Sequence, residues 1–136
     1  MKLAGKTAII TGGSGGIGRA VSLRYAQEGA RCVVADVQLS LAEAVVKEIK
    51  SAGGSALAIS MDVTKQVDID QTIQAAVAAF GQVDILFNNA AIFEMAPLLE
   101  SSRESYDRLF DINVKGMFFM MQAVAAHMVE KGVRGK

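Results

Sequence analysis

The sequence predicts an α/β fold in which helices cover both faces of a parallel β-sheet. Three observations favour it. Short apolar runs alternate with amphipathic helical patterns, glycines stand where the helices should end, and a glycine-rich turn joins the first run to the first helix. An alternation of strands and helices implies right-handed crossovers and a doubly wound parallel sheet. The chain has 136 residues, 51% of them hydrophobic, which is enough for one domain with a real core.

Four apolar runs bounded by turn residues are the expected strands. They cover residues 6–10, 31–35, 56–60 and 83–87. Runs that are apolar at successive positions are typical of strands buried on both faces. We therefore expect helices above and below this sheet.

Helical periodicity fills the three intervals between these runs. Gly29, Gly53 and Gly81 are predicted to end the helices, and Thr64 is predicted to cap the third. In each helix the apolar residues lie three or four positions apart and form one stripe. These stripes are Ile17, Val21 and Tyr25; Leu41, Val45 and Ile49; and Ile69, Ile73, Val77 and Phe80.

A loop follows the fourth strand, and a long helical pattern follows the loop. Residues 92–99 include the only proline, and Ser101 and Glu104 have the spacing of a capping box. The helical pattern runs from about residue 105 to 131, and Gly132 is expected to end it. Its methionine-rich part, residues 117–128, is apolar on several faces, so we expect either a subunit interface or an internal core there. The last two residues resemble the beginning of another strand.

Composition and charge exclude several classes of protein. Fourteen basic residues balance fourteen acidic ones, so the basic excess that nucleic-acid binding requires is absent. The N-terminus has no apolar run, and no segment reaches the length of a membrane-spanning helix, so we predict a cytoplasmic protein without a membrane partner. Cys32 is the only cysteine, which excludes an intrachain disulfide and a cysteine-rich metal site. We expect Cys32 to be core, His127 to be solvated, and no metal to be bound.

The strongest functional signal is the turn after the first strand. Its glycines match both the G-x-G-x-x-G spacing and the T-G-x-x-x-G-x-G spacing of dinucleotide-binding turns. Without Cβ atoms the backbone can approach a pyrophosphate, and the N–H groups and dipole of the following helix can hold that anion. The sheet is therefore predicted to be of the Rossmann type. The cofactor-binding residues predicted here are Gly12, Ser14, Gly15, Gly16, Ile17 and Gly18.

Asp36, at the end of the second strand, selects among dinucleotides. A carboxylate at this position accepts hydrogen bonds from the adenosine ribose hydroxyls and repels a 2′-phosphate. Neither Gly15 nor Val37 offers a cation that could hold such a phosphate. The sequence therefore predicts NAD as the cofactor rather than NADP.

These motifs together resemble the short-chain dehydrogenase/reductase family. Asp62-Val63 stands where the family places an acid near the adenine amino group. Asn88-Asn89-Ala90-Ala91 is similar to its N-N-A-G signature, with Ala91 in place of the usual glycine. The resemblance implies that Asp62, Val63, Asn89, Ala90 and Ala91 contact the cofactor. It also implies that Asn113 is a catalytic residue that interrupts its helix and orders a water in a proton relay.

The resemblance also shows what residues 1–136 lack. The family's proton transfer uses a serine and a Tyr-x-x-x-Lys pair. Here the residue four positions after Tyr25 is Gly29, and the residue four positions after Tyr106 is Phe110, so neither tyrosine has the lysine. We interpret residues 1–136 as the N-terminal part of a single dinucleotide-binding domain, truncated after the helix that follows strand four and inactive alone. The resemblance implies that the full-length protein is a homo-oligomer, a dimer or a tetramer.

Two classes of function remain open from the sequence. The first is an NAD-dependent oxidoreductase acting on a small-molecule alcohol or ketone. Within the family, residues 92–124 are most similar to bacterial polyol (sorbitol-type) dehydrogenases, and reductases of 3-oxoacyl thioesters are close competitors. The second is a non-catalytic nucleotide-binding module or fragment. Nucleotide-dependent methyl transfer on a similar sheet is disfavoured by Asn88, Asn89 and Asn113.

Overall fold

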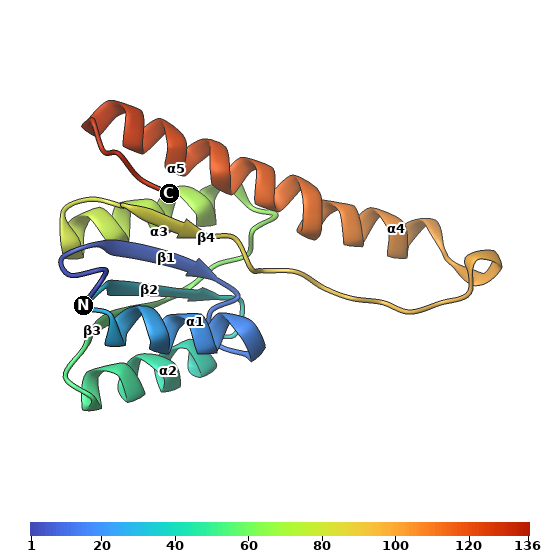
Figure 1. The fold of residues 1–136 in the computed structure, drawn as a ribbon. Helices are drawn as coiled ribbons and strands as arrows, with labels where there is room; N and C mark the ends of the chain where they lie inside the picture. The colour runs from blue at the N-terminus through green and yellow to red at the C-terminus, as the bar shows by residue number, and fades with distance from the viewer.

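Four parallel strands form one sheet in the computed structural model, which describes residues 1–136. The strands are β1 (Thr7–Thr11), β2 (Arg31–Asp36), β3 (Ser55–Ser60) and β4 (Ile85–Phe87). Their order across the sheet is β3-β2-β1-β4, so β1 pairs with both β2 and β4. Every pairing is parallel, and the arrows of β1, β2 and β4 point the same way in Figure 1, so the carboxyl ends of the strands share one edge.

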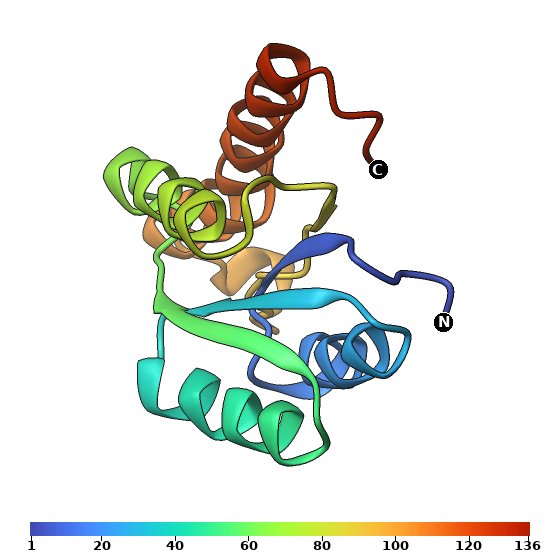
Figure 2. The same cartoon turned by 90° about the vertical axis from the view of Figure 1, so that its left-hand side faces the viewer.

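Helices cover both faces of the sheet, as the sequence predicts. The helices α1 (Gly16–Gln27) and α2 (Leu39–Ser51) lie on one face, and α3 (Gln66–Phe80) and α5 (Met117–Lys131) lie on the other (Figure 2). A long loop with one 3-10 turn, η1 (Leu98–Glu100), leads from β4 to α4 (Arg103–Phe110). The doubly wound α/β fold is therefore confirmed.

Two apolar layers, one on each face of the sheet, make up the core. Ile10 and Val34 pack with Val45 and Ile49 of α2, whereas the neighbouring strand residues Ile9 and Val33 pack with α3 and α5. This alternation follows from strand geometry, because successive side chains point to opposite faces. Cys32 belongs to the first layer, as predicted, and its burial raises the pKa of the thiol to about 12.

The predicted helix ends are correct, but two predicted caps are not. Gly29, Gly53, Gly81 and Gly132 all have positive φ, which glycine adopts without strain. Thr64 does not cap α3, because its hydroxyl donates to Asp62 and the helix begins at Gln66. Helix α4 is capped by Ser102 and not Ser101, since the Ser102 hydroxyl accepts from the Ser105 N–H.

The fourth strand is shorter than predicted, because it begins at Ile85 and not at Val83. Asp84, just before it, is buried: its carboxylate accepts from the Thr7 N–H, and its own N–H donates to the Thr7 carbonyl, both at 2.9 Å. Val83 N–H donates to Nε2 of His127 at 3.1 Å. His127 is therefore buried where α5 packs against the segment that enters β4, so the prediction of a solvated histidine was wrong.

The long helical pattern after residue 103 is divided by a π-helical turn, η2 (Asp111–Gly116), between α4 and α5. The predicted interruption at Asn113 is thus confirmed. Only Met120, Val124 and His127 of α5 are buried, and Phe118 and Met121 are about half exposed. The helix supplies core on one side and leaves an apolar surface on the other.

None of the helices combines the length and the hydropathy that a membrane span requires. At the free edge of β4, Lys136 N–H donates to the Asp84 carbonyl and Leu86 N–H donates to the Lys136 carbonyl, both at 2.9 Å. This pairing agrees with the prediction that the last residues resemble the beginning of a strand.

Candidate active site at the carboxyl edge of the sheet

A cavity of about 440 Å³ opens at the carboxyl edge, where the ends of β1, β2 and β4 meet the segment after β3. Open α/β sheets bind ligands at this edge, near the point where the strand order reverses. Here that point lies between β1 and β4. Most of the predicted cofactor-binding residues line the cavity: Gly12, Ser14, Gly15, Asp36, Asp62, Val63, Asn89, Ala90 and Ala91.

Four predicted residues do not line the cavity. Gly16 and Ile17 are exposed in the first turn of α1, beside its mouth. Gly18 is buried beneath the glycine turn, where a Cβ atom would collide with the Gly12 carbonyl. Asn113 lies in η2, behind the loop that follows β4.

The glycine turn combines close packing below with open space above. A Cβ on Gly13 would lie 2.9 Å from the Ile10 carbonyl, so this part of the turn can hold only glycine without a shift. Gly15 and Gly16 differ, because nothing lies within 4 Å of a Cβ built on either. This space is where the sequence predicts that a pyrophosphate approaches the backbone.

The N-terminus of α1 has hydrogen-bond donors to offer. The first N–H groups of a helix have no partner within the helix, and a side chain at the N-cap commonly satisfies one of them. The N-cap residue of α1 is Gly15, and no side chain caps the helix. Its dipole and free donors therefore face the open space above Gly15 and Gly16, an arrangement suited to an anion.

Asp36 is held at the cavity wall by three donors. The Ser14 hydroxyl donates to Oδ2 at 2.6 Å, and the Ser14 N–H donates to the same oxygen at 3.2 Å. The Gln38 N–H donates to Oδ1 at 3.0 Å. No lysine or arginine lines the cavity, so the carboxylate has no cationic neighbour there.

Asp62 is the second carboxylate of the cavity, and its own segment orients it. Its Oδ1 accepts from the Thr64 hydroxyl at 2.7 Å and from the Thr64 N–H at 2.9 Å, while Lys65 lies 3.7 Å from Oδ2. The hydrogen bond from the Thr64 hydroxyl is the main cause of the lowered pKa of Asp62. A charged acceptor is therefore maintained at this end of the cavity.

Thr11 links the glycine turn to the segment after β4, and sequence reasoning missed it. Its hydroxyl oxygen accepts from the N–H groups of Asn89 and Ala90, both at 3.0 Å. In return, the Asn89 side-chain amide donates to the carbonyls of Thr11 and Gly12, at 3.2 and 3.0 Å. A signal was available in the sequence, because Thr11 is the first residue of the T-G-x-x-x-G-x-G pattern.

Asn113 pairs with the backbone of a single residue. Its Oδ1 accepts from the Ile92 N–H and its Nδ2 donates to the Ile92 carbonyl, both at 2.8 Å. The side chain thus fixes the loop after β4 to η2. A π turn also changes the partners of helical carbonyls, and such turns are frequent at functional sites.

Residues outside the predicted cofactor set, most of them apolar, complete the cavity. Leu41 is 45% exposed, although it belongs to the predicted apolar stripe of α2. It lines the cavity with Val37, Gln38, Met61, Ile92 and Ile112. Their position in the sequence was the available signal. Val37, Gln38, Met61 and Ile92 follow the carboxyl end of a strand within a few residues, and Leu41 and Ile112 lie on helical segments packed beside a strand end.

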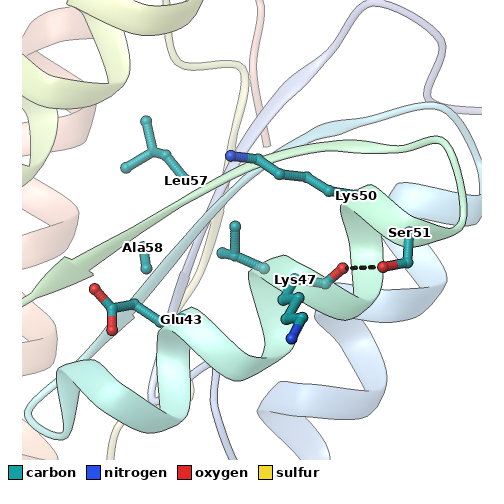
Figure 3. Close-up of a pocket in the computed structure, with 7 residues that line it drawn as sticks. Glu43, Lys47, Lys50, Ser51, Leu57 and Ala58 are labelled. Atoms are coloured by element: carbon teal, nitrogen blue, oxygen red, sulfur yellow. Dashed lines mark hydrogen bonds between the residues drawn. The ribbon is translucent and has the colours of Figure 1, made fainter.

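A larger groove of about 630 Å³ lies elsewhere, between α2 and the outer edge of β3 (Figure 3). It is lined by Glu43, Lys47, Lys50, Leu57 and neighbours, and the labelled charged side chains do not converge on a common point. Lys50 reaches across the free edge of β3, a placement that discourages pairing with another strand. Size therefore does not identify the site, whereas the glycine turn, Asp36 and Asp62 do.

Comparisons with known proteins agree with this geometry. A family model described as short chain dehydrogenase matches residues 6–136. The sorbitol dehydrogenase of Cereibacter sphaeroides is 52% identical over 136 residues, which are 100% of this chain and 52% of that protein. The galactitol 2-dehydrogenase of Agrobacterium fabrum is 43% identical over the same shares of both chains.

Two further relatives extend the comparison. The 3-oxoacyl-[acyl-carrier-protein] reductase of Thermotoga maritima is 34% identical over 96% of this chain and 53% of that protein. A crystal structure of a short-chain type dehydrogenase/reductase from Mycobacterium marinum superposes with a TM-score of 0.95 at 38% identity, covering 98% of this chain and 53% of that one. The chain spans about half the length of the curated relatives it matches.

Proposed function

Because the chain belongs to the short-chain dehydrogenase family, we propose that residues 1–136 form the NAD-binding, N-terminal part of an oxidoreductase that interconverts an alcohol and a ketone. The observation that carries this proposal is the cavity itself, in which the uncapped N-terminus of α1 and the Asp36 carboxylate face the same space. A bound nicotinamide dinucleotide would supply hydride transfer to or from the substrate carbon.

Different residues of the cavity suit different parts of such a cofactor. The free N–H groups of α1 and the open backbone at Gly15 and Gly16 suit the pyrophosphate. Asp36 suits the adenosine ribose hydroxyls, and the Asp62 carboxylate suits an adenine amino group. Thr11 and Asn89 keep the two sides of the switch point together and act as positioning residues.

The preference for NAD over NADP rests on charge. A 2′-phosphate on the adenosine ribose would meet the Asp36 carboxylate, and no lysine or arginine in the cavity lining offsets that repulsion. This supports NAD.

The proposed substrate is a polyol. The sorbitol and galactitol dehydrogenases among the relatives support this class, and the reductase of 3-oxoacyl groups supports a competing one. Ile92, where the loop after β4 meets the cavity, is placed by Asn113. We propose that Asn113, by fixing this loop and the π turn, also orders the relay water that the family resemblance implies.

The residues that transfer the proton are proposed to lie outside residues 1–136. Neither tyrosine of these residues lines the cavity: Tyr25 packs edge-on against Phe87, and Tyr106 stacks on Phe110. We therefore expect these residues alone to bind NAD without turning over a substrate.

The experiment that tests this proposal uses the protein expressed from its complete reading frame. NAD and NADP are titrated by calorimetry, and NADH formation is then followed with sorbitol and galactitol, against NADH oxidation with a 3-oxoacyl thioester. Tight NAD binding with polyol oxidation is the expected result. Turnover of the thioester alone would move the substrate to the reductase class. NAD binding without any turnover would favour a non-catalytic nucleotide-binding module.

A homo-oligomer is proposed as the working assembly, a dimer or a tetramer. Phe110, Val114, Phe118 and Met121 of α4, η2 and α5 are each about half exposed. Apolar patches of this kind commonly mark subunit interfaces. Sedimentation of the protein from the complete reading frame would measure the state directly, and a monomer would contradict it.

A further inference from the structure

The hydroxyl of Ser14 occupies a place that the adenosine ribose also needs. Both donors of Ser14 reach the same atom, Oδ2 of Asp36, with the hydroxyl at 2.6 Å and the N–H at 3.2 Å. The other carboxylate oxygen, Oδ1, accepts from the Gln38 N–H at 3.0 Å. Three protein donors therefore converge on Asp36 when no ligand is bound.

The Asp36 carboxylate has too few acceptor sites for its three protein donors and both ribose hydroxyls. An ionised carboxylate has about four lone-pair sites, so three donors leave about one of them free. The two hydroxyl groups of a ribose bring two donors. One protein donor must therefore leave Asp36 before both ribose hydroxyls can bind it.

Only one of the three donors can leave without moving the backbone. The Ser14 N–H belongs to the glycine turn, which is tied to β2 by the hydrogen bond from Gly13 N–H to the Ala35 carbonyl at 3.2 Å. The Gln38 N–H stands at the start of α2, where the Gln38 carbonyl already accepts from Leu41 and Ala42. The Ser14 hydroxyl turns about a single side-chain bond, and Ser14 is partly exposed to the cavity.

We propose that the Ser14 hydroxyl is a placeholder for one ribose hydroxyl. In the free protein it donates a charge-assisted hydrogen bond to Oδ2 of Asp36. When a ligand with a vicinal ribose diol enters, the Ser14 hydroxyl rotates away and leaves its acceptor site on Asp36 Oδ2 to a ribose hydroxyl. The proposal rests on the proposed binding of NAD. It makes Ser14 a competitor of the ribose, because its own hydrogen bond to Asp36 is lost as the ribose hydrogen bonds are gained.

The consequence is a measurable coupling between Ser14 and the ribose. In the wild-type protein the gain from the second ribose hydroxyl is offset by the loss of the Ser14 bond. In Ser14→Ala that offset is gone. A ligand that lacks one ribose hydroxyl needs only the free acceptor site, so Ser14→Ala should not change its affinity.

The experiment is a double-mutant cycle by calorimetry on the protein from the complete reading frame. Its ligands are NAD and the analogue with 2′-deoxyadenosine. We expect Ser14→Ala to bind NAD about tenfold more tightly than wild type, and to lose about tenfold more affinity than wild type when the hydroxyl is removed. Ser14→Thr keeps a hydroxyl beside Asp36 and should restore the wild-type pattern. Ser51→Ala, whose exposed hydroxyl donates to the Lys47 carbonyl in the groove of Figure 3, is the matched control and should match wild type with both ligands.

Two results would overturn the placeholder. One is an equal loss of affinity in wild type and Ser14→Ala on removal of the ribose hydroxyl. The other is weaker NAD binding by Ser14→Ala, which would make the hydroxyl a direct cofactor ligand. If wild type itself fails to bind NAD, the proposed function fails instead, so the two failures are distinguishable.

Discussion

Two aspartates at opposite edges of the same sheet show how one residue type serves two purposes. Asp84, at the amino edge, is 2% exposed and accepts from Thr7 N–H, Gln82 Nε2 and Lys6 Nζ at 2.9, 2.8 and 3.3 Å. Asp36, at the carboxyl edge, also accepts three hydrogen bonds, but it lines the cavity. The number of hydrogen bonds is equal, and access to solvent is not.

The difference teaches where a carboxylate stabilises the fold and where it binds a ligand. Thr7, which donates to Asp84 through its N–H, begins β1, and Gln82, which donates through its side chain, lies two residues before Asp84. The Asp84 carboxylate therefore joins β1 to the segment that enters β4. Asp36 joins the glycine turn to the start of α2 and keeps acceptor capacity toward the cavity. We therefore expect the amino edge to govern stability and, on the proposed function, the carboxyl edge to govern binding.

Replacing Asp84 should give the largest effect. Asp84→Ala leaves the buried Thr7 N–H without an acceptor, so the free energy of unfolding should fall by about 3 kcal/mol. Urea denaturation measures this loss. NAD affinity of the folded fraction should be unchanged, and a wild-type denaturation midpoint would contradict the stabilising role.

Replacing Asp36 should give the reverse pattern. Asp36→Ala removes the ribose acceptor, so NAD affinity should fall about 100-fold and the exclusion of NADP should be relieved. The free energy of unfolding should change by only about 1 kcal/mol, because Asp36 is partly exposed. Calorimetry with both dinucleotides measures the affinities, and urea denaturation of the same sample measures the stability. A loss of stability as large as that in Asp84→Ala would contradict the comparison.

Acid should weaken the amino edge by a smaller amount. Burial raises the pKa of Asp84, but the hydrogen bonds from Thr7, Gln82 and Lys6 outweigh it and hold this pKa below the usual 3.8. A lowered pKa in the folded state means that the stabilisation is full above the unfolded-state pKa and is lost as pH falls through the folded-state pKa.

Urea denaturation at about pH 6 and about pH 3 should therefore show a loss in wild type that is smaller than the loss caused by Asp84→Ala. In Asp84→Asn the acid-dependent part should shrink, because the amide does not titrate. Asp62 retains its own contribution, since its pKa is also lowered. An unchanged pH dependence in Asp84→Asn would show that Asp84 contributes nothing to it.

The smallest effect is expected at Lys6. Its side chain is 50% exposed, although it lies 3.3 Å from the buried Asp84 carboxylate. Lys6→Met should change the free energy of unfolding by less than about 0.5 kcal/mol, because solvent screens exposed ion pairs. A larger loss in the denaturation midpoint would assign the stability of the amino edge to the ion pair rather than to the Thr7 N–H.

Much of this arrangement was predictable from local patterns. Apolar runs identified all four strands, and glycines with positive φ identified the helix ends, because both signals act over a few residues. The glycine turn, Asp36 and Asp62 were placed at one edge because the carboxyl ends of parallel strands meet there. A local pattern is sufficient where the physical cause is local.

One error is local: Thr64 is a residue type that commonly caps helices, but its hydroxyl donates to Asp62, two residues before it. The other errors arise where a partner distant in the sequence decides. His127 is polar at the end of an apolar helix, and the Val83 N–H from another segment makes it an interior acceptor. Thr11 begins the T-G-x-x-x-G-x-G pattern, but its function in joining the two segments appears only when β4 lies beside β1.

The strand order β3-β2-β1-β4 also bears on how the chain is made. As the polypeptide leaves the ribosome from its N-terminus, β1 can pair with β2 soon after both emerge, but its other side waits for β4. During that interval Ile9 and Ile10, fully buried in the finished sheet, belong to a strand with one open side. A nascent chain paused before residue 85 therefore exposes this open side of β1, which β4 covers once it pairs.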